Sequence, residues 1–277
     1  RECSVQRRNQ KIVEESPSVF VTPELRKDMG EKAVAAAKAV NYIGAGTIEF
    51  LVDKHRNYYF LEMNTRLQVE HPITEEVVGV DLVKEQIKVA DNQVLKLKQE
   101  DIKQRGHAIE CRICAEDTEM NFMPSPGVIK QITEPNGIGV RIDSYVYEGY
   151  EIPIYYDPMI GKLIVWATTR EYAIERMRRV LHEYKLTGVK NNISYLRCIM
   201  DTADFVEGHY DTGFIAKNGE ALQKCITHTS ERSEKIAMIA AYMDYLMNLE
   251  ENSGSATDNR PISKWKEFGL HKGVLRI

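Results

Sequence analysis

Two hydrophobic runs in the N-terminal part of the chain predict a β-hairpin. Residues 46–52 and 58–63 are rich in β-branched and aromatic side chains, and the polar residues 53–57 separate them. Such runs around a short polar segment are typical of two antiparallel strands joined by a turn. With the turn centred in that segment, Glu49 lies directly opposite Glu62 on one face of the sheet. A one-residue slip in register would place the two carboxylates on different faces.

A second pattern, with apolar residues three and four positions apart, predicts helices. Thr22 and Pro23 favour a helix start, because Thr is a good N-cap and Pro is preferred at the first helical position. The apolar spacing continues to Val40, and this helix is expected to pack behind the hairpin. Further helices are expected at residues 81–90, 170–184 and 234–249. Residues 251–255 then have the composition of a flexible segment.

Between the second and third predicted helices the pattern changes to short strands separated by turn residues. The predicted strands are residues 107–113, 127–133, 140–144 and 162–168. A β-rich region therefore follows a hairpin with helices and precedes further helices. This order predicts an α+β fold.

The second strand of the hairpin runs into a row of alternating polar residues. Glu62, Asn64, Arg66, Gln68 and Glu70 are each two positions apart. In an extended backbone all five side chains would point to the same face of the sheet. A solvated strand face is the simplest explanation of such a row, but Asn is disfavoured in strands and needs another reason to be there.

Glu49, Glu62 and Asn64 form a candidate metal site on the hairpin. Like charges directly opposite each other on a sheet are destabilising, so a cation is expected between the two carboxylates. Two carboxylates and one amide offer oxygen ligands only, which suits Mg²⁺ or Mn²⁺ with positions left open for phosphate. Without the metal, we expect the carboxylates to be pushed apart or held by a base such as Lys11.

Composition and charge limit the function classes. The chain has 277 residues and 43% hydrophobic content, which is typical of one large or two small globular domains. Its net charge of -4 gives no sign of nucleic-acid binding. No apolar run reaches the roughly 20 residues that span a bilayer, and the start has no signal-peptide pattern. These features favour a soluble, cytoplasmic protein.

The five cysteines are an odd number at irregular positions, which favours a reducing compartment over a disulfide framework. Cys111 and Cys114 have the spacing of a zinc or redox pair. A second pair or partner histidines at suitable spacing do not accompany them in the sequence, so a metal or redox role is the weaker alternative. We interpret both as thiols of the hydrophobic core.

Several segments resemble the biotin carboxylase family of ATP-grasp enzymes. The polar row reads Arg-Leu-Gln-Val-Glu-His-Pro at residues 66–72, and it follows Glu49, Glu62 and Asn64 in the order of that family. Four other segments match in order and spacing: residues 1–11, 106–112, 124–127 and 156–163. The resemblance covers residues 1–220. It implies a ligase that uses ATP and bicarbonate to carboxylate biotin held on a carrier protein.

The resemblance also implies roles for individual residues. The implied sets are Glu49, Glu62 and Asn64 for Mg²⁺ or Mn²⁺ at the ATP phosphates; Lys11, Arg66, Gln68 and the backbone of Val69 for bicarbonate; Gln6, Asn9 and Leu51 for the nucleotide; and Glu70, Arg66 and Arg141 for catalysis. Glu70 would be the general base that deprotonates bicarbonate. Arg141 would stabilise the enolate-like oxygen of deprotonated biotin, although its own sequence context is that of an ordinary surface strand. Asn9 replaces a His of some members, and both side chains can hydrogen-bond a ribose hydroxyl.

The same resemblance implies a division of the chain into three parts. Residues 1–104 would be the C-terminal portion of an ATP-grasp domain, residues 105–223 the C-terminal domain of biotin carboxylase, and residues 224–277 a helical tail or linker. The family's N-terminal domain, most of its glycine-rich lid loop and the lid lysines have no counterpart in these 277 residues. The chain is therefore expected to be a fragment that is inactive alone.

The implied partners lie outside the chain. A Met-Lys-Met sequence, the family's mark of biotin attachment, does not occur, so biotin would arrive on another domain or subunit. A carboxyltransferase would complete an acyl-CoA or pyruvate carboxylase, and a second copy could pair through the C-terminal domain.

Two alternatives belong to other function classes. A carboxylate-amine or carbamoyl-phosphate-type ligase would share the Glu, Glu and Asn metal set but would lack Arg-x-Gln-x-Glu-His-Pro. A docking module would use the tail helix and the charged and aromatic residues 264–268 as an interface.

Overall fold

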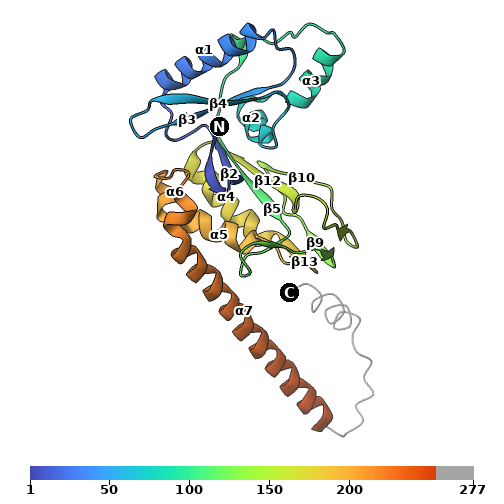
Figure 1. Ribbon diagram of the computed structural model, residues 1–277. Helices are drawn as coiled ribbons and strands as arrows, with labels where there is room; N and C mark the ends of the chain where they lie inside the picture. Colours follow the sequence, from blue (N-terminus) through green and yellow to red (C-terminus); the bar gives the residue numbers. More distant parts are fainter. Residues whose placement is uncertain (254–277) are drawn as a thin grey trace. The chain divides into compact units, whose positions relative to one another are not determined.

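The computed structural model of this chain describes residues 1–253, with side-chain detail for residues 1–227 and 235–246. It divides into two units, Arg1–Thr227 and His228–Ile277. The first unit combines helices with antiparallel sheets, which confirms the predicted α+β fold (Figure 1). Within residues 1–253, no helix is both long enough and apolar enough to cross a bilayer.

A five-stranded antiparallel sheet forms the centre of the first unit. Its strands, in spatial order, are β1 (Glu2–Arg7), β2 (Gln10–Ser16), β5 (His107–Cys114), β12 (Met159–Ala167) and β10 (Val140–Ser144). The two-residue turn between β1 and β2 holds Arg8 and Asn9, both at positive φ, as type I′ hairpin turns require. The sheet thus joins segments that lie far apart in the chain, such as β2 and β5.

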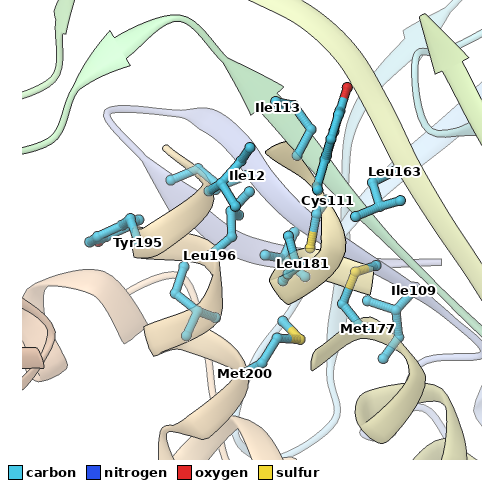
Figure 2. Close-up of a cluster of buried hydrophobic side chains, with 14 of the residues drawn as sticks. Ile12, Ile109, Cys111, Ile113, Leu163, Met177, Leu181, Tyr195, Leu196 and Met200 are labelled. Atoms are coloured by element: carbon cyan, nitrogen blue, oxygen red, sulfur yellow. The ribbon is translucent and has the colours of Figure 1, made fainter. Parts of the chain in front are cut away.

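One face of this sheet carries the main hydrophobic core. Alternate residues of β5 (Ile109, Cys111 and Ile113) point to this face, where helices α4 (Arg170–Glu183) and α5 (Ile193–Asp201) pack. Figure 2 shows these side chains packed against Met177, Leu181 and Leu196 from the two helices. Both helices are amphipathic, so burying their apolar sides against the sheet stabilises them.

The opposite face of the sheet carries a smaller apolar cluster. Ile73 and Val77 of helix α2 (His71–Val78) pack against Ala108 of β5 and Ile164 of β12. Glu110 and Arg112, which follow Ala108 at alternate positions of β5, are charged. Helix α2 therefore covers a sheet face that is part apolar and part charged.

The predicted hairpin is present with the expected register. Strands β3 (Thr47–Val52) and β4 (Tyr58–Asn64) pair in antiparallel fashion, and Glu49 is the partner of Glu62. Next to this pair, between Glu49 and Phe50, the register shifts by a bulge. The prediction of an in-register pair is thus confirmed, and the slipped alternative is wrong.

The predicted helices around the hairpin are also present. Helix α1 (Pro23–Ala39) begins after an N-cap at Thr22, whose hydroxyl accepts a bond from Leu25 N, and α3 (Leu82–Ala90) begins after an N-cap at Asp81. Helix α1 buries none of its residues. It meets the hairpin through a hydrogen bond from the Tyr58 hydroxyl to the Asp28 carboxylate.

The rest of the first unit is made of short elements. The predicted strand over residues 127–133 is two strands, and between them Ile129 N donates to the carbonyl of Tyr150 and Lys130 N to that of Thr187. The short elements are β6 (Glu116–Asp117), β7 (Met123–Pro124), β8 (Gly127–Val128), β9 (Gln131–Thr133), β11 (Glu151–Ile152), β13 (Lys185–Thr187), α6 (Ala203–Glu207) and the 3-10 turn η1 (Gln99–Asp101). They form three two-stranded pairs, β6 with β7, β8 with β11 and β9 with β13.

The C-terminal part of the described chain corrects two expectations. Helix α7 (Phe214–Ser253) contains the predicted helix of residues 234–249 but begins earlier, at Phe214, and continues into the segment predicted to be flexible. A disulfide joins Cys198 of α5 to Cys225 of α7, although the odd number of cysteines argued against a disulfide framework. Residues 264–268, the proposed interface segment, lie outside the described residues.

The two cysteines with zinc-like spacing are core thiols, as predicted. Cys111 and Cys114 are both buried and not disulfide-bonded. Burial disfavours the thiolate and raises the pKa of both well above the usual value. Neither thiol is therefore poised to bind a metal or to react.

Candidate active site

The two hairpin carboxylates converge on one amide. The Asn64 side-chain amide donates to Glu49 Oε1 at 3.1 Å and to Glu62 Oε1 at 2.9 Å. Lys11 Nζ, from strand β2, also donates to Glu49 Oε1 at 3.0 Å. The expectation that a base such as Lys11 holds this carboxylate is therefore confirmed for Glu49. The three candidate metal ligands lie together.

The prediction that the polar row shares one strand face is wrong beyond Asn64. Strand β4 ends at that residue, and Glu70 already serves as the N-cap of helix α2. The chain must leave the sheet here because Ile73 and Val77 bury against the central sheet, and Pro72 lies in the first turn of the helix that carries them.

Gln68 and Glu70 nevertheless return to the hairpin carboxylates. The Gln68 side-chain amide donates to Glu49, and Lys11 Nζ donates to Glu70 Oε1 at 2.6 Å. Lys11 therefore bridges Glu49 and Glu70, which belong to different elements. Arg66 lies apart from this group: it is exposed, and its guanidinium donates to the carbonyl of Leu67 at 3.2 Å.

Glu70 is a buried carboxylate held between two cations. Its side chain is 3% exposed and accepts from Lys11 and, through Oε2, from Arg112 at 3.0 Å. Burial alone would raise the pKa of Glu70, but the hydrogen bond and charge of Lys11 outweigh it, so the pKa lies below the usual value. Glu70 is therefore ionised at neutral pH and can accept a proton.

Two cations at this site were not assigned a role from the sequence, although both lie in segments that carried the family resemblance. Arg112 of β5 donates from Nε to Glu14 Oε1 at 2.6 Å, and its Nη2 contacts both Glu14 Oε1 and, at 3.0 Å, Glu70 Oε2. Lys162 of β12 donates to the carbonyl of Val69 at 3.0 Å. Both residues sit in strands whose pattern reads as ordinary alternation, so only the sheet pairing reveals them.

Arg141 lies at the edge of the same sheet and is anchored by acidic groups. Its guanidinium makes two bonds to Asp143, at 2.8 and 3.0 Å, and one to Glu75 Oε2 of helix α2 at 2.7 Å. Burial raises the pKa of Asp143, but the bonds from Arg141 and the charge of Lys162 lower it by more, so the pKa lies below its usual value. The guanidinium is held rigidly while its side chain stays one-third exposed.

The three candidate nucleotide residues occupy two elements. Gln6 is the cross-strand partner of Lys11, and Asn9 lies in the tight turn of the same β1–β2 hairpin. Leu51 is half-exposed on β3. Gln6 is thus adjacent to the charged group around Lys11, Asn9 lies at the tip of the hairpin, and Leu51 offers an open apolar surface.

The residues present suit a hard metal ion that also binds a substrate. Within residues 1–253, no group of three or more His, Cys, Asp or Glu side chains is placed to hold a metal ion by itself. The Glu49, Glu62 and Asn64 set supplies two carboxylates and one amide that already meet. Phosphate oxygens would have to complete such a coordination shell.

Comparison with known proteins finds two family models that match segments of the first unit. Residues 110–217 match the family model described as biotin carboxylase C-terminal domain, and residues 1–98 match that of the carbamoyl-phosphate synthase L chain, ATP binding domain. A chloroplastic biotin carboxylase of Arabidopsis thaliana is 55% identical over 222 residues, which are 80% of this chain and 41% of the relative. One of the pyruvate carboxylase subunits of Methanothermobacter thermautotrophicus is 49% identical over 262 residues, covering 90% of this chain and 53% of the relative.

Solved structures agree in fold. The biotin carboxylase domain of a thermophilic 2-oxoglutarate carboxylase bound to bicarbonate has a TM-score of 0.78 and 48% identity, covering 79% of this chain and 50% of that one. This chain spans about half the length of the relatives it matches. Residues 1–98 are thus similar to an ATP-binding domain, and residues 110–217 are similar to the C-terminal domain of biotin carboxylase.

Proposed function

We propose that this chain contributes part of the active site of an enzyme that carboxylates biotin on a carrier protein, with ATP and bicarbonate as co-substrates. The observation that carries the proposal is the bridge made by Lys11 between Glu49 and Glu70. One amine thereby joins a candidate metal ligand to a candidate general base, at 3.0 Å from the first and 2.6 Å from the second. A reaction that couples phosphoryl transfer to deprotonation needs these groups side by side.

Glu49, Glu62 and Asn64 would hold Mg²⁺ or Mn²⁺. The bound ion would supply positive charge to offset the ATP phosphates. Two facing carboxylates support this role, because they are mutually repulsive until a cation is added. Gln6, Asn9 and Leu51 would contact the nucleotide, with Leu51 as an apolar surface for the base.

Lys11, Arg66, Gln68 and the backbone of Val69 would bind bicarbonate. An amine and an amide already meet at Glu49, which places donors in a common region. Arg66 offers a planar fork of donors that matches an oxyanion. Its exposed position means that it has to turn from the Leu67 carbonyl toward the anion.

Glu70 would accept the bicarbonate proton on a carboxylate oxygen. Lys11 and Arg112 keep the carboxylate ionised, and burial excludes water that would otherwise protonate a reactive product. Arg141 would stabilise the oxygen of deprotonated biotin by charge, and its clamp between Asp143 and Glu75 fixes its orientation.

The proposed partners are a carboxyltransferase, a biotin carrier on another domain or polypeptide, and a second copy of the chain that pairs through its C-terminal domain. Two facts support these assignments. The Methanothermobacter relative is named as one subunit of a pyruvate carboxylase, which supports separate partner polypeptides. A solved biotin carboxylase domain of a 2-oxoglutarate carboxylase is a dimer, which supports pairing with a second copy. We also propose a cytoplasmic location. The free cysteines Cys3, Cys111 and Cys114 support it, whereas the Cys198–Cys225 disulfide is of a kind found mainly in oxidising compartments.

The test uses the full-length protein that carries this chain. Glu70→Gln should slow bicarbonate-dependent and biotin-dependent phosphate release by about 10² to 10⁴-fold, because a general base is lost, while nucleotide affinity stays near normal. Glu85→Gln is the matched control, since Glu85 pairs with Lys88 within its own helix. Full activity in the Glu70→Gln protein would rule out Glu70 as the base.

A carbamoyl-phosphate-type ligase is the second candidate, because the model that matches residues 1–98 carries that description. The two reactions can be distinguished by the second substrate on which phosphate release depends. We expect phosphate release to depend on biotin and not on ammonia or glutamine; dependence on a nitrogen donor would favour the second candidate.

A further inference from the structure

Two acidic side chains are buried next to each other beneath the candidate base. Glu14 of β2 and Glu110 of β5 are direct cross-strand partners, and both are fully buried. In the part of the chain that the structure describes, Glu14 Oε2 and both carboxylate oxygens of Glu110 have no hydrogen-bond partner. Two ionised carboxylates in such a place would be strongly unfavourable.

Arg112 connects this pair to Glu70. Its Nε donates to Glu14 Oε1 at 2.6 Å, and an amino group of the same guanidinium contacts Glu70 Oε2 at 3.0 Å. The guanidinium therefore lies between a carboxylate outside the proposed reaction and the proposed base. The Arg112 side chain is only 12% exposed, which leaves little room for another orientation.

The other charged groups on this sheet face have partners of their own. Lys162 of β12 binds Asp143 at 3.2 Å, and Lys11 of β2 binds Glu49 and Glu70. Helix α2, which covers the face, contributes titratable groups that engage one another and Arg141: His71, Glu75 and Glu76. Arg112 is the cation that contacts Glu14 directly.

We propose that Glu14 and Glu110 share one proton, and that ionised Glu14 anchors Arg112 so that its Nη2 group positions Glu70 as the base. The inference rests on the proposed function of Glu70. Burial raises the pKa of Glu110 well above its usual value, with the charge of Glu14 adding to it. Burial also raises the pKa of Glu14, which Arg112 opposes, to about 7.

Glu110 therefore carries the proton, and its hydroxyl can donate to the free Oε2 of Glu14. The proton stays within the pair and is not delivered to substrate. When the pH falls and Glu14 takes up a second proton, Arg112 loses its anionic anchor. Glu70 then loses the position that the anchored guanidinium gives it, so this pair sets an acid limit on activity.

The first experiment measures the protonation state in the 277-residue chain itself. Infrared spectroscopy at neutral pH should show the carbonyl stretch of a buried protonated carboxyl, and Glu110→Gln should remove it. The matched control is Glu15→Gln: Glu15 is the next residue on β2, equally buried, but bound by His107 and Arg170, so the band should persist. Absence of the band in the unsubstituted chain would overturn the shared proton.

Folding of the variants provides a second measurement. Gln has the shape of a protonated Glu, so Glu110→Gln should keep the helix content and unfold at a temperature no lower than the parent chain at neutral pH. Loss of folding in Glu110→Gln would mean that an ionised carboxylate is needed there, which contradicts the proposal.

The third measurement is the pH profile of kcat/KM for bicarbonate in the full-length protein. Glu14→Gln should lower kcat/KM for bicarbonate by about tenfold to a hundredfold and leave the KM for ATP nearly unchanged, because Glu70 is mispositioned. Glu110→Gln should move the acid limb to higher pH, since ionised Glu14 then loses the hydrogen bond from the Glu110 hydroxyl. Unchanged profiles in both variants would leave only a structural role. If the unsubstituted protein cleaves no ATP with bicarbonate, the proposed function fails while the infrared result still tests the proton.

Discussion

At the scale of single residues, the chemistry depends on one lysine with two carboxylate partners. Lys11 draws Glu49 and Glu70 to the same amine, although Lys11 and Glu70 are 59 positions apart in the sequence. An amine shared in this way lowers the repulsion between the two carboxylates. Removing it should therefore affect metal binding and proton transfer together.

Lys11→Met tests this coupling. We expect the variant of the full-length protein to lose at least about tenfold in kcat/KM for bicarbonate, because an anion-binding donor and the partner of Glu70 are lost together. Steady-state kinetics against bicarbonate and ATP would measure it. Lys88→Met is the control, since Lys88 pairs with Glu85 on α3, away from these carboxylates. Equal kinetics in the two variants would contradict the shared role.

Glu62→Gln separates the metal site from the base. Glu62 contacts Asn64 and lies opposite Glu49, so its charge matters for a cation and not for Glu70. We expect the KM for ATP to rise, with a higher Mg²⁺ concentration needed for half-maximal activity. Isothermal titration with MgADP would check it, and unchanged affinity would exclude Glu62 from the metal site.

The buried acids also make a prediction about stability and pH. A carboxyl whose folded pKa lies above its unfolded value binds more protons when folded, so stability falls as pH rises from about 4.5 toward the folded pKa. Glu110→Gln removes this contribution. The free energy of unfolding should then decline less between about pH 5 and 7, by about 1 kcal/mol for each pH unit and proton.

Urea titrations of the 277-residue chain at several pH values would measure this slope. Glu15 provides the contrast: burial raises its pKa, but His107 and Arg170 outweigh burial, so the net shift is downward. Its contribution is present above the unfolded pKa and is lost as pH falls through the folded one. An unchanged slope in the Glu110→Gln chain would argue against a raised pKa of Glu110.

At the scale of elements, the sequence pattern predicted those features that depend on residues close together in the chain. The β3–β4 register follows from a turn between two short runs, and the caps at Thr22 and Asp81 follow from residues within one helical turn. The row beyond Asn64 was misread because alternation alone does not reveal a helix that begins at His71. At this point the burial of Ile73 against the central sheet determines that the chain forms a helix instead of continuing as a strand.

Pairings between distant segments lay beyond such patterns. Strand β2 lies beside β5, and only that contact brings Glu14 to Glu110 and Arg112 to Glu70. Arg112 sits in an alternating strand like many surface arginines, and its sequence neighbours carry no sign of its partners. The Cys198–Cys225 disulfide likewise depends on how α7 meets α5, which an odd cysteine count does not indicate.

One glycine tests the packing of the short strands. Gly188 has φ of +101°, and an added Cβ would lie 2.2 Å from the carbonyl oxygen of Val128 and 2.6 Å from the amide of Lys130. Gly188→Ala should destabilise the chain by about 2–4 kcal/mol, because both the backbone and the neighbouring strand must move.

The control is Gly30→Ala in helix α1, where an added Cβ meets no atom within 4 Å. That change should stabilise the chain by up to about 1 kcal/mol, since Ala is the better helix former. Thermal and urea unfolding would measure both variants. Similar effects of the two substitutions would show that the strand contact at Gly188 is not tight.

At the scale of the whole molecule, the hairpin leaves much apolar surface open. Leu51, Tyr59, Phe60 and Leu61 are each about half-exposed, and β3 and β4 form a two-stranded sheet. Exposed apolar strands with unpaired edges favour association. We expect the 277-residue chain to associate as its concentration rises, and Phe60→Lys to reduce this in sedimentation velocity. Identical sedimentation of both chains at all concentrations would contradict the idea.

The share of the relatives' length that these residues cover bears on activity. The 277 residues supply the carboxylates, Lys11 and Arg141 but span about half the length of their relatives. Phosphoryl transfer depends on positioning and on charge placed around every phosphate, and in our proposal Glu49, Glu62 and Asn64 act on the phosphates only through a bound metal ion. The polypeptide of these residues alone is therefore expected not to carboxylate free biotin.

Phosphate release with ATP, Mg²⁺, bicarbonate and biotin measures this directly. The control is the full-length protein under the same conditions, which should release phosphate in a biotin-dependent way. Circular dichroism of the 277-residue chain would show that it is folded, because the central sheet, α4 and α5 carry their own buried core. An inactive but folded chain is the expected result. Biotin-dependent release at the rate of the full-length protein would mean that the essential phosphate-binding groups lie within these 277 residues, and the roles given to Glu49, Glu62 and Lys11 would have to be extended to the whole phosphate chain.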